Sequence, residues 1–526
     1  MVRAECPSMG EQPTDDALDT DDRSGAPSVV TMGLTPDVAS PTPEEPAGEP
    51  VVARRGFFLA RILREPMWVL GLVLFMDEVD KNVVRGLITP LKQDFGVGDL
   101  GIGVLLSLAL LFNGLITVPA GYLADRWNRS RAIGQTVIGW SVLSAGGAAS
   151  VGFPMLVGMR SALGFGQAIT EPSAASLIGD YYPPDQRGKA FSVQQVMLLA
   201  GTGFGVGLGG FIGTNYGWRP ALVIVAIPGL IVSWLVFRLR EPRRGTADMM
   251  AAIGAGTIEH AEEGDHPALF ENGFRQFLRD MVQGLREDMR VILDIRTMRY
   301  ALAGVAALLF TVTALAAWLP QYFERHLHMA EGTGEALFFA LIVFGGIPGV
   351  LMGGRVADRY AQKMQGGRLA LPAIFIAVGN VLFTAAYMLR SDTYSRSLVT
   401  VVFVLQLVGI FVMTMAIPGL RAGLTDAIPA HLRGAGFGAF NLVAVVCGQA
   451  AAPFIVSLIS NQFGENLRVA FLACSPLLFL GAAILFRARK FLDEDMNKIM
   501  MAVLQALQDE KERAEDRAAD QGVHPT

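Results

Sequence analysis

The sequence is poor in the residues from which catalytic and metal sites are built. Its 526 residues include only 3 cysteines and 6 histidines. Cys6, Cys447 and Cys474 are far apart and match neither a disulfide framework nor the ligand spacing of a zinc site. His326 and His328 are too few for a metal site, and the pattern offers no nucleophilic triad. We therefore expect a protein that is not an enzyme and that uses no metal or other cofactor.

Charged residues are scarce as well. They make up 17% of the chain, whereas a soluble domain has about a quarter, and apolar residues make up 52%. The formal net charge is −5, and much of the acid lies in the two tails, so nothing indicates a surface for nucleic acid. A chain of this composition is expected to lie largely in lipid.

The first 50 residues contain almost no aromatic side chains and are rich in Pro, Asp, Glu, Ser and Thr. Such a stretch cannot bury enough apolar surface to offset the entropy of ordering. It also lacks the basic and then apolar pattern of a cleaved signal peptide. We expect residues 1–60 to form a disordered cytoplasmic tail and the first apolar run to remain as a membrane span.

Apolar runs long enough to cross a bilayer, which takes about 20 residues per helix, recur along the rest of the chain. They lie at about 67–90, 101–123, 131–151, 154–180, 188–214, 218–238, 299–323, 333–357, 368–390, 397–424, 434–460 and 467–487. The sequence thus predicts an all-α membrane protein with twelve transmembrane helices. Its predicted parts are an N-terminal six-helix bundle at 61–240, a linker at 241–298, a C-terminal six-helix bundle at 299–488 and a cytoplasmic C-terminal helix and tail at 489–526.

Basic residues in the short loops predict the orientation. The loops after the second, fourth, eighth and tenth runs hold more of them than the opposite loops, for example Arg126, Arg129, Arg187 and Arg359. Both termini and the linker are therefore expected in the cytoplasm, with the chain in the plasma (inner) membrane if it is bacterial. Apolar residues at helical spacing over 269–292 alternate with arginines, which predicts an amphipathic linker helix. This helix either lies at the headgroup surface or packs on the bundle.

One loop motif occurs once in each half. Gly-Tyr-Leu-Ala-Asp-Arg begins at Gly121, and Gly-Arg-Val-Ala-Asp-Arg begins at Gly354. A pattern shared by corresponding loops implies duplicated halves. The aspartate can bind a helix N-terminus or an arginine, so we expect the motif to gate the cytoplasmic side rather than serve only as a positive anchor. The candidate gating residues are Gly121, Asp125, Arg126, Arg129, Asp358 and Arg359.

These loops resemble the signature loop of the major facilitator superfamily, and the resemblance spans about residues 65–490. Within that superfamily the chain is most similar to the Spinster family of lipid transporters, through Asp80-Lys81, the first loop motif, and Arg160 with the glycines that follow it. The resemblance implies two pseudo-symmetric six-helix bundles that move a small solute by alternating access. Two positions depart from the family, because Gln167 stands where it usually has Glu and Lys81 where it usually has Arg.

The first run contains five charged residues within an otherwise apolar span, namely Asp77, Glu78, Asp80, Lys81 and Arg85. Each would cost about 2.5–3.5 kcal/mol if it faced lipid at mid-membrane, so the group needs neutralisation or water. Helical geometry places all of them on one face, which can turn to a cavity. Asp77 and Lys81 are four residues apart and within reach, as are Lys81 and Arg85. The group is either a substrate and proton-coupling site or a structural ion-pair network.

In the fourth run, Arg160, Gln167 and Glu171 project from one side because they are seven and four residues apart. A buried arginine needs a carboxylate partner, for which Asp80 and Glu171 are the candidates. In the resembled family the helix 1 Asp and the helix 4 Arg belong to the substrate and proton-coupling site, which implies that role for Asp80, Lys81 and Arg160. Glu171 rests on spacing alone: it either replaces the carboxylate missing at Gln167 or is structural.

The second half offers an apolar wall instead. Aromatic and methionine side chains, and almost no charge, occupy the centres of its runs. A cavity with charges on one wall and apolar residues on the other suits an amphiphile. The candidate substrate and proton-coupling residues are Asp77, Asp80, Lys81, Arg160, Gln167, Glu171, Trp318 and Phe344.

We therefore expect a secondary transporter, coupled to protons, for a lysophospholipid- or sphingolipid-like amphiphile. Its partners would be the substrate, protons and membrane lipids, and it would act as a monomer. The alternatives are a major facilitator transporter of a soluble organic anion or drug, and a membrane receptor or scaffold that does not transport. Buried charge on two helices argues against the scaffold, because a scaffold need not sustain the cost of burying it.

The glycines over 201–210 form no nucleotide loop, because no strand precedes them, and they indicate close helix packing.

Overall fold

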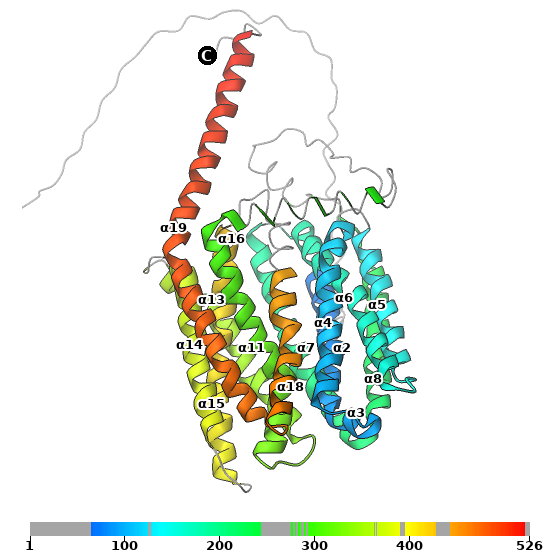
Figure 1. The fold of residues 1–526 in the computed structure, drawn as a ribbon. Helices are drawn as coiled ribbons and strands as arrows, with labels where there is room; N and C mark the ends of the chain where they lie inside the picture. The colour runs from blue at the N-terminus through cyan, green and yellow to red at the C-terminus, as the bar shows by residue number, and fades with distance from the viewer. Residues whose placement is uncertain are drawn as a thin grey trace, which may run out of the picture. The chain divides into compact units, whose positions relative to one another are not determined.

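The structure is a computed structural model of the chain. It describes residues 65–124, 128–182, 184–242, 295–361, 366–389, 395–427 and 442–520, with position 363 and isolated positions over 275–294. These residues all belong to one unit, Gly56–Thr526. Every regular element within them is a helix (Figure 1). The predicted tail at 1–60 and most of the predicted amphipathic linker helix lie outside the described residues, so the domain boundaries stay predictions.

The first half begins with a helix in three pieces. The first predicted span consists of α2 (Pro66–Val83), the 3-10 turn η1 (Val84–Leu87) and α3 (Ile88–Phe95). The next five spans are single helices, α4 (Asp99–Ala124), α5 (Arg129–Gly147), α6 (Phe153–Tyr181), α7 (Pro184–Tyr216) and α8 (Trp218–Phe237).

The second half has more interrupted helices. The seventh span is α11 (Arg296–His326), and the eighth is α12 (Thr333–Leu341), the π-helical segment η2 (Ile342–Gly346) and α13 (Ile347–Ala361). The remaining spans are α14 (Gly367–Met388), α15 (Arg396–Thr414) with α16 (Ala416–Ala427), η4 (Ala444–Gln449) with α18 (Ala451–Gln462), and α19 (Leu467–Asp520). The predicted all-α membrane fold is confirmed, with a helix in each of the twelve predicted spans.

Within the described ranges, 9 helices are long and apolar enough to cross a membrane. The predicted spans outside this set are the first, third and fourth, and their helices are more polar. The helix α2 carries the charged residues over 77–81, α5 begins with Arg129 and is rich in Gly and Ser, and α6 carries Arg160 and Glu171. The polarity of these three spans is therefore local, and much of it lies in the candidate site.

The helix α7 packs through glycines, as the sequence predicts. A Cβ added at Gly201 would lie 2.5 Å from the carbonyl oxygen of Phe75 on α2, and one at Gly209 would lie 2.4 Å from that of Val83. On another face of α7, a Cβ at Gly207 would lie 3.2 Å from Phe339 of the second half. Glycine lets the backbones approach this closely. The helix α7 thus contacts both the first span and the second half.

The two halves also meet along α4. A Cβ added at Gly103 would lie 2.1 Å from Ser457 Oγ on α18, and one at Gly114 would lie 2.6 Å from Val445 in η4. The interface between the halves therefore runs along α4 with α18 and along α7 with α12 and η2.

The last helix differs from the prediction of a separate polar helix after the twelfth span. The helix α19 continues without a break from Leu467 to Asp520, because no glycine or proline occurs between Gly481 and its end. Its middle is tied to the second half. Asp495 Oδ2 accepts the backbone N–H of Thr297, the second residue of α11, at 2.9 Å, and Asp493 Oδ2 accepts that of Gly366 at 3.2 Å.

Candidate functional site

The helix α2 neutralises much of its own charge. Lys81 Nζ donates to Asp77 Oδ2 at 2.5 Å and to Glu78 Oε1 at 3.3 Å. Glu78 also accepts hydrogen bonds from Asn82 Nδ2 at 3.0 Å and from the Thr202 hydroxyl on α7 at 3.2 Å. The pairing of Asp77 with Lys81 that the four-residue spacing predicts is therefore present, and Asp77 is buried.

Asp80 is the point where α2, α5 and α6 meet. It is 3% exposed, and it accepts hydrogen bonds from the Ser144 hydroxyl on α5 and from Gln167 Nε2 on α6, the latter at 3.2 Å. Arg160 Nη1 lies 3.5 Å from Asp80 Oδ2 and donates to the Asp80 carbonyl oxygen at 3.1 Å. Of the two carboxylates predicted as the partner of Arg160, the structure places Asp80 there, whereas Glu171 is exposed.

A pocket lies beside this cluster, between α2, η1, α4 and α6. Its polar lining consists of Lys81, Arg85, Asn113, Arg160 and Gln167. Its apolar lining comes mainly from α4 and consists of Val84, Leu105, Leu106, Ala109, Leu110 and Leu163. One wall can bind charge, and the other can hold hydrocarbon. Among the residues that the structure describes, no group of three or more His, Cys, Asp and Glu side chains could hold a metal ion.

The two aromatic residues predicted for an apolar wall lie away from this pocket. Trp318 is 0% exposed, and its Nε1 donates to the carbonyl oxygen of Pro453 at 3.2 Å, which fastens α11 to α18. Phe344 lies in η2 and is 68% exposed. The apolar lining is therefore on α4, in the same half as the charges, and not in the second half as the composition of the spans suggested.

The predicted gating motif is described only in part. Asp125 and Arg126 lie outside the described residues, and for Gly121 and Asp358 only the backbone is described. Arg359 is exposed at the end of α13. The prediction that these residues gate one side of the transporter stays a prediction.

Arg129, the remaining member of the motif, holds three segments together. It is 1% exposed at the start of α5 and forms an ion pair with Asp180 on α6. Its Nη1 also donates to Ser176 Oγ at 2.8 Å, and its Nε donates to Glu241 Oε1, after α8, at 2.9 Å. The other Glu241 oxygen accepts the backbone N–H of Ser130 at 2.9 Å. We call these five residues the Arg129 clasp.

The charge state of the clasp follows from its hydrogen bonds. Burial raises the pKa of Glu241, but the hydrogen bonds from the Ser130 backbone and the Arg129 guanidinium outweigh it, so the pKa is lowered from 4.5. Burial opposes the charge of Arg129, yet the hydrogen bonds that it donates to Glu241 and Asp180 raise its pKa. Both groups are therefore ionised at neutral pH, and the clasp is closed.

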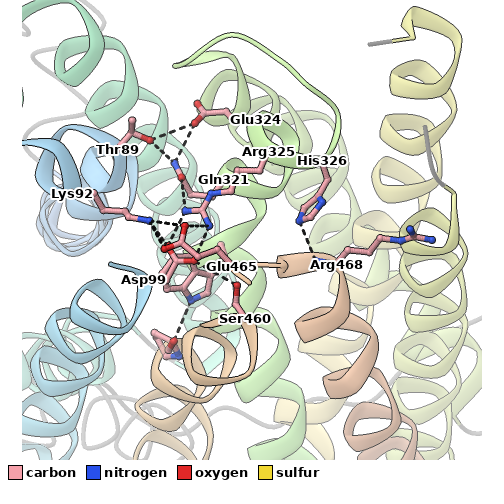
Figure 2. Close-up of polar contacts among 12 residues, drawn as sticks. Thr89, Lys92, Asp99, Gln321, Glu324, Arg325, His326, Ser460, Glu465 and Arg468 are labelled. Carbon is pink, nitrogen blue, oxygen red and sulfur yellow. Dashed lines mark hydrogen bonds and ion pairs between the residues drawn. The ribbon is translucent and has the colours of Figure 1, made fainter. Parts of the chain in front are cut away.

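A second network, which the sequence reasoning missed, joins the two halves at the opposite end of α4 (Figure 2). Asp99, the first residue of α4, is 0% exposed. Arg325 of α11 binds it with two parallel hydrogen bonds of 2.7 and 2.8 Å, and Lys92 Nζ donates to it at 2.8 Å. Glu465 lies 3.3 Å from Lys92 Nζ, and Ser460 Oγ lies 3.5 Å from Asp99. We call these five residues the outer lock.

The outer lock extends along α3. Gln321 Nε2 donates to Thr89 Oγ1 at 2.9 Å and lies 3.3 Å from Glu324 (Figure 2). The other Glu324 oxygen accepts the backbone N–H of Gly332 at 2.9 Å. Thr89 belongs to the first half and the other three residues to the second. The halves are therefore joined by charge and hydrogen bonds at this end of the molecule.

Local sequence signals could not single out the outer lock. An acidic first residue such as Asp99 is ordinary at a helix N-terminus. Lys92 and Arg325 lie just after the first and seventh apolar runs, where basic residues bear only on the predicted orientation. The partners Asp99 and Arg325 are 226 residues apart, so only the association of the halves brings them together.

Comparisons with known proteins agree with this architecture. A family model described as Major Facilitator Superfamily matches residues 70–447. The "Probable L-galactonate transporter" of Escherichia coli (strain K12) is 23% identical over 465 residues, which cover 87% of this chain and 95% of that protein. "Protein spinster homolog 1" of Homo sapiens is 23% identical over 477 residues, covering 85% and 84%.

A third relative and a solved structure are also similar to this chain. The "Sphingosine-1-phosphate transporter SPNS2" of Mus musculus is 26% identical over 302 residues, covering 54% of this chain and 50% of that protein. The crystal structure of a bacterial homologue of the human lysosomal transporter Spinster, in an inward-facing and unoccupied conformation, matches with a TM-score of 0.65 at 19% identity. That match covers 82% of this chain and 98% of the other. The resemblance to the Spinster family seen in the sequence is confirmed.

Proposed function

Because this chain belongs to the major facilitator superfamily, we propose that it is a proton-coupled secondary transporter that moves a lysophospholipid- or sphingolipid-like amphiphile by alternating access. The main support is the pocket beside Asp80. Lys81 and Arg160 can bind a polar head, and the leucines of α4 can contact one hydrocarbon chain. The similarity to the mouse sphingosine-1-phosphate transporter favours the same class of substrate.

Asp80 is our candidate for the proton site. It is buried, its cationic partner is Arg160, and its other side-chain partners, Ser144 and Gln167, are neutral. Protonation of Asp80 would release Arg160 from its counter-ion, so uptake of a proton and binding of an anionic head would favour each other. Gln167 cannot titrate, which leaves the exchange to a single carboxyl in this cluster of described residues.

The outer lock supports alternating access. A buried aspartate bound by two cations from different segments holds the halves together at one end. We propose that this end faces away from the cytoplasm, because the loops at the other end carry the excess of basic residues. Both termini would then be cytoplasmic, in the plasma (inner) membrane if the cell is bacterial, and the transporter would act as a monomer.

A soluble organic anion is the second candidate substrate, and the similarity to a probable L-galactonate transporter favours it. Lys81 and Arg160 would bind a sugar acid as readily as a lipid head, but such a ligand makes no use of the leucines on α4. The two candidates therefore differ in what the apolar wall contributes.

Transport by the purified chain in liposomes tests the proposal. We expect a pH gradient to drive uptake of an isotope-labelled single-chain phospholipid and to leave labelled L-galactonate outside. Uptake of L-galactonate alone would replace the amphiphile with the soluble anion. If neither probe moves in either direction of the gradient, the proposal of proton-coupled transport fails, and the receptor or scaffold alternative takes its place.

A further inference from the structure

The 3-10 turn η1 carries a buried guanidinium that the ion pairs of α2 do not neutralise. Arg85 is 8% exposed and lines the same pocket as Lys81 and Arg160. Arg85 Nη1 donates to the side-chain oxygen of Asn82, which lies three residues earlier at the end of α2. This hydrogen bond and the burial of the side chain hold the guanidinium beside the pocket.

Among the described residues, Arg85 forms no ion pair. Lys81 is shared by the two nearby acids, Asp77 and Glu78, so it offsets only one of their two negative charges. The remaining charge, on Glu78, attracts Arg85 without a direct contact between the two side chains. Asn82 is neutral, and it links Arg85 to Glu78 only indirectly, because the Asn82 amide donates to Glu78 Oε2 at 3.0 Å. Burying a charge is costly unless it is paired, so this guanidinium is suited to a counter-ion that arrives with a ligand.

Both guanidinium groups of the pocket keep donors for such a ligand. Within the described ranges, the Nε of Arg85 and the Nε and Nη2 of Arg160 are buried without a hydrogen-bond partner. An unpaired buried donor costs about 1–3 kcal/mol, and a guanidinium fork matches the oxygens of phosphate or carboxylate. Two such groups on one pocket indicate an anion with more acceptor oxygens than a carboxylate has.

We propose that Arg85 is a specificity-determining residue that, together with Arg160, selects a phosphomonoester over a carboxylate or a phosphodiester. This inference rests on the proposed function and names the head of its amphiphile. A phosphomonoester offers three acceptor oxygens and about −1.5 to −2 charges at pH 7, whereas the other two heads carry a single negative charge. When Asp80 is protonated, the two guanidinium groups present two positive charges to a head with nearly two negative ones.

The same head occurs in lipids and in water-soluble esters. Leu105, Leu106 and Leu110 on the apolar wall favour an ester that carries one hydrocarbon chain. A short ester such as glycerol 3-phosphate presents the same oxygens to Arg85 and Arg160 but leaves the leucines uncovered. Comparing the two separates recognition of the head from recognition of the chain.

Binding to the purified full-length chain tests Arg85. The probes are lysophosphatidic acid, lysophosphatidylcholine of the same chain length, glycerol 3-phosphate and L-galactonate, and the variants are Arg85→Gln and Arg85→Lys. We expect Arg85→Gln to weaken lysophosphatidic acid binding by about tenfold or more and lysophosphatidylcholine binding by no more than about twofold. Arg85→Lys keeps the charge without the fork, so its loss for lysophosphatidic acid should be smaller. The matched control is Arg396→Gln, which removes an exposed arginine far from the pocket in sequence.

The outcomes separate this inference from the proposed function. Equal losses for both lysolipids, or no loss for either, would overturn the role of Arg85 and leave the amphiphile in place. If only glycerol 3-phosphate binds, and Arg85→Gln abolishes its advantage over L-galactonate, Arg85 keeps its role and the amphiphile fails. If neither phosphomonoester binds to the native chain, the role of Arg85 and the proposed amphiphile substrate are both wrong. Retained lysophosphatidylcholine binding, or an unchanged thermal unfolding curve, shows that a variant is folded.

Discussion

At the scale of the residue, the proposed role of Asp80 rests on the side chains that contact its carboxylate. Three side chains from two other helices donate to it or pair with it, and Arg160 is the one cation among them in the described part of the chain. A carboxylate in such a setting can exchange its counter-ion for a proton without breaking the two neutral hydrogen bonds. This setting is the basis of our proposal that Asp80 couples proton and substrate.

Replacing Asp80 by Asn keeps the shape and most hydrogen bonds but removes the titrating group. We expect Asp80→Asn to reduce transport driven by a pH gradient to background in liposomes, while the protein stays folded in detergent. The control is Glu494→Gln, which removes an exposed carboxylate from α19 outside the candidate site and should retain most of the activity. Undiminished gradient-driven uptake by Asp80→Asn would remove Asp80 from the coupling mechanism.

Residue pairs within one helix were predictable from the sequence, and pairs between helices were predictable only in part. Asp77 with Lys81 follows from a spacing of four. Arg160 with Asp80 required the argument that a buried arginine needs an acid, and the resemblance to a family narrowed the choice. The structure describes Trp318 as a buried packing residue, and its place in the substrate site stays a prediction, because a packing tryptophan and a cavity-lining one have the same sequence environment.

At the scale of the element, the 3-10 turn η1, which interrupts the first span, packs closely against α7. A Cβ added at Gly86 in η1 would lie 2.3 Å from the carbonyl oxygen of Val206 and 2.5 Å from the nitrogen of Gly210, both on α7. The sequence predicted an unbroken span over 67–90, because a single glycine in a helical pattern does not by itself indicate a 3-10 turn. The close contact of η1 with α7 is a tertiary feature that the sequence pattern does not show.

Substitution of Gly86 tests this contact. Gly86→Ala should destabilise the protein by about 1–3 kcal/mol or more, because the methyl group meets main-chain atoms that cannot rotate away. Gly139→Ala on α5 is the matched control, since a Cβ there meets nothing within 4 Å, and removing a helical glycine should be neutral or stabilising. Thermal unfolding in detergent measures both. Equal unfolding temperatures for the two variants would contradict the close approach of η1 to α7.

The Arg129 clasp gives the first half a predictable response to acid. The pKa of Glu241 is lower in the folded chain than its unfolded value of 4.5, so its stabilisation is present above that pH and is lost as the pH falls through the folded pKa. We expect Glu241→Gln to lower the unfolding temperature at pH 7 and to converge with the native protein when the pH falls well below 4.5.

The control for the clasp is Glu494→Gln, which removes an exposed pair with Lys498 on α19. It should change the unfolding temperature little at any pH, because exposed ion pairs contribute little to stability. A Glu241→Gln deficit that persists unchanged into acid would show that the carboxylate acts through its shape and not through its charge.

At the scale of the whole molecule, the outer lock joins the two halves at the end where α4 begins with Asp99. The ion pairs link α3 and α4 of the first half to α11 and the segment before α19 of the second (Figure 2). Such long-range pairs could not be predicted from the sequence, because no local pattern marks any of the partners. The duplicated loop motif and the twelve spans, by contrast, are local patterns that the sequence states directly.

Removing the central acid of the lock should shift the population of states. Loss of one partner of a buried ion pair costs about 3–5 kcal/mol, enough to favour a state open at this end. We expect Asp99→Asn to raise the labelling rate of a cysteine at Leu106, in a background without natural cysteines, about tenfold for a thiol reagent added to the outer face. Asp94→Asn is the matched control, because Asp94 pairs with Arg219 inside the first half. Equal labelling of the two variants would show that the lock does not hold this end closed.

The continuous helix α19 has a practical consequence for measuring such motions. Its middle is hydrogen-bonded to the start of α11 and to Gly366, so the part of α19 that follows these contacts must move with the second half. From residue 490 to Asp520 it extends roughly 45 Å at 1.5 Å per residue. Each degree of tilt at the base would therefore move the tip by about 0.8 Å. The projecting part of α19 therefore amplifies small rotations of the second half. A dye at its far end would convert such a rotation into a displacement that single-molecule fluorescence can follow.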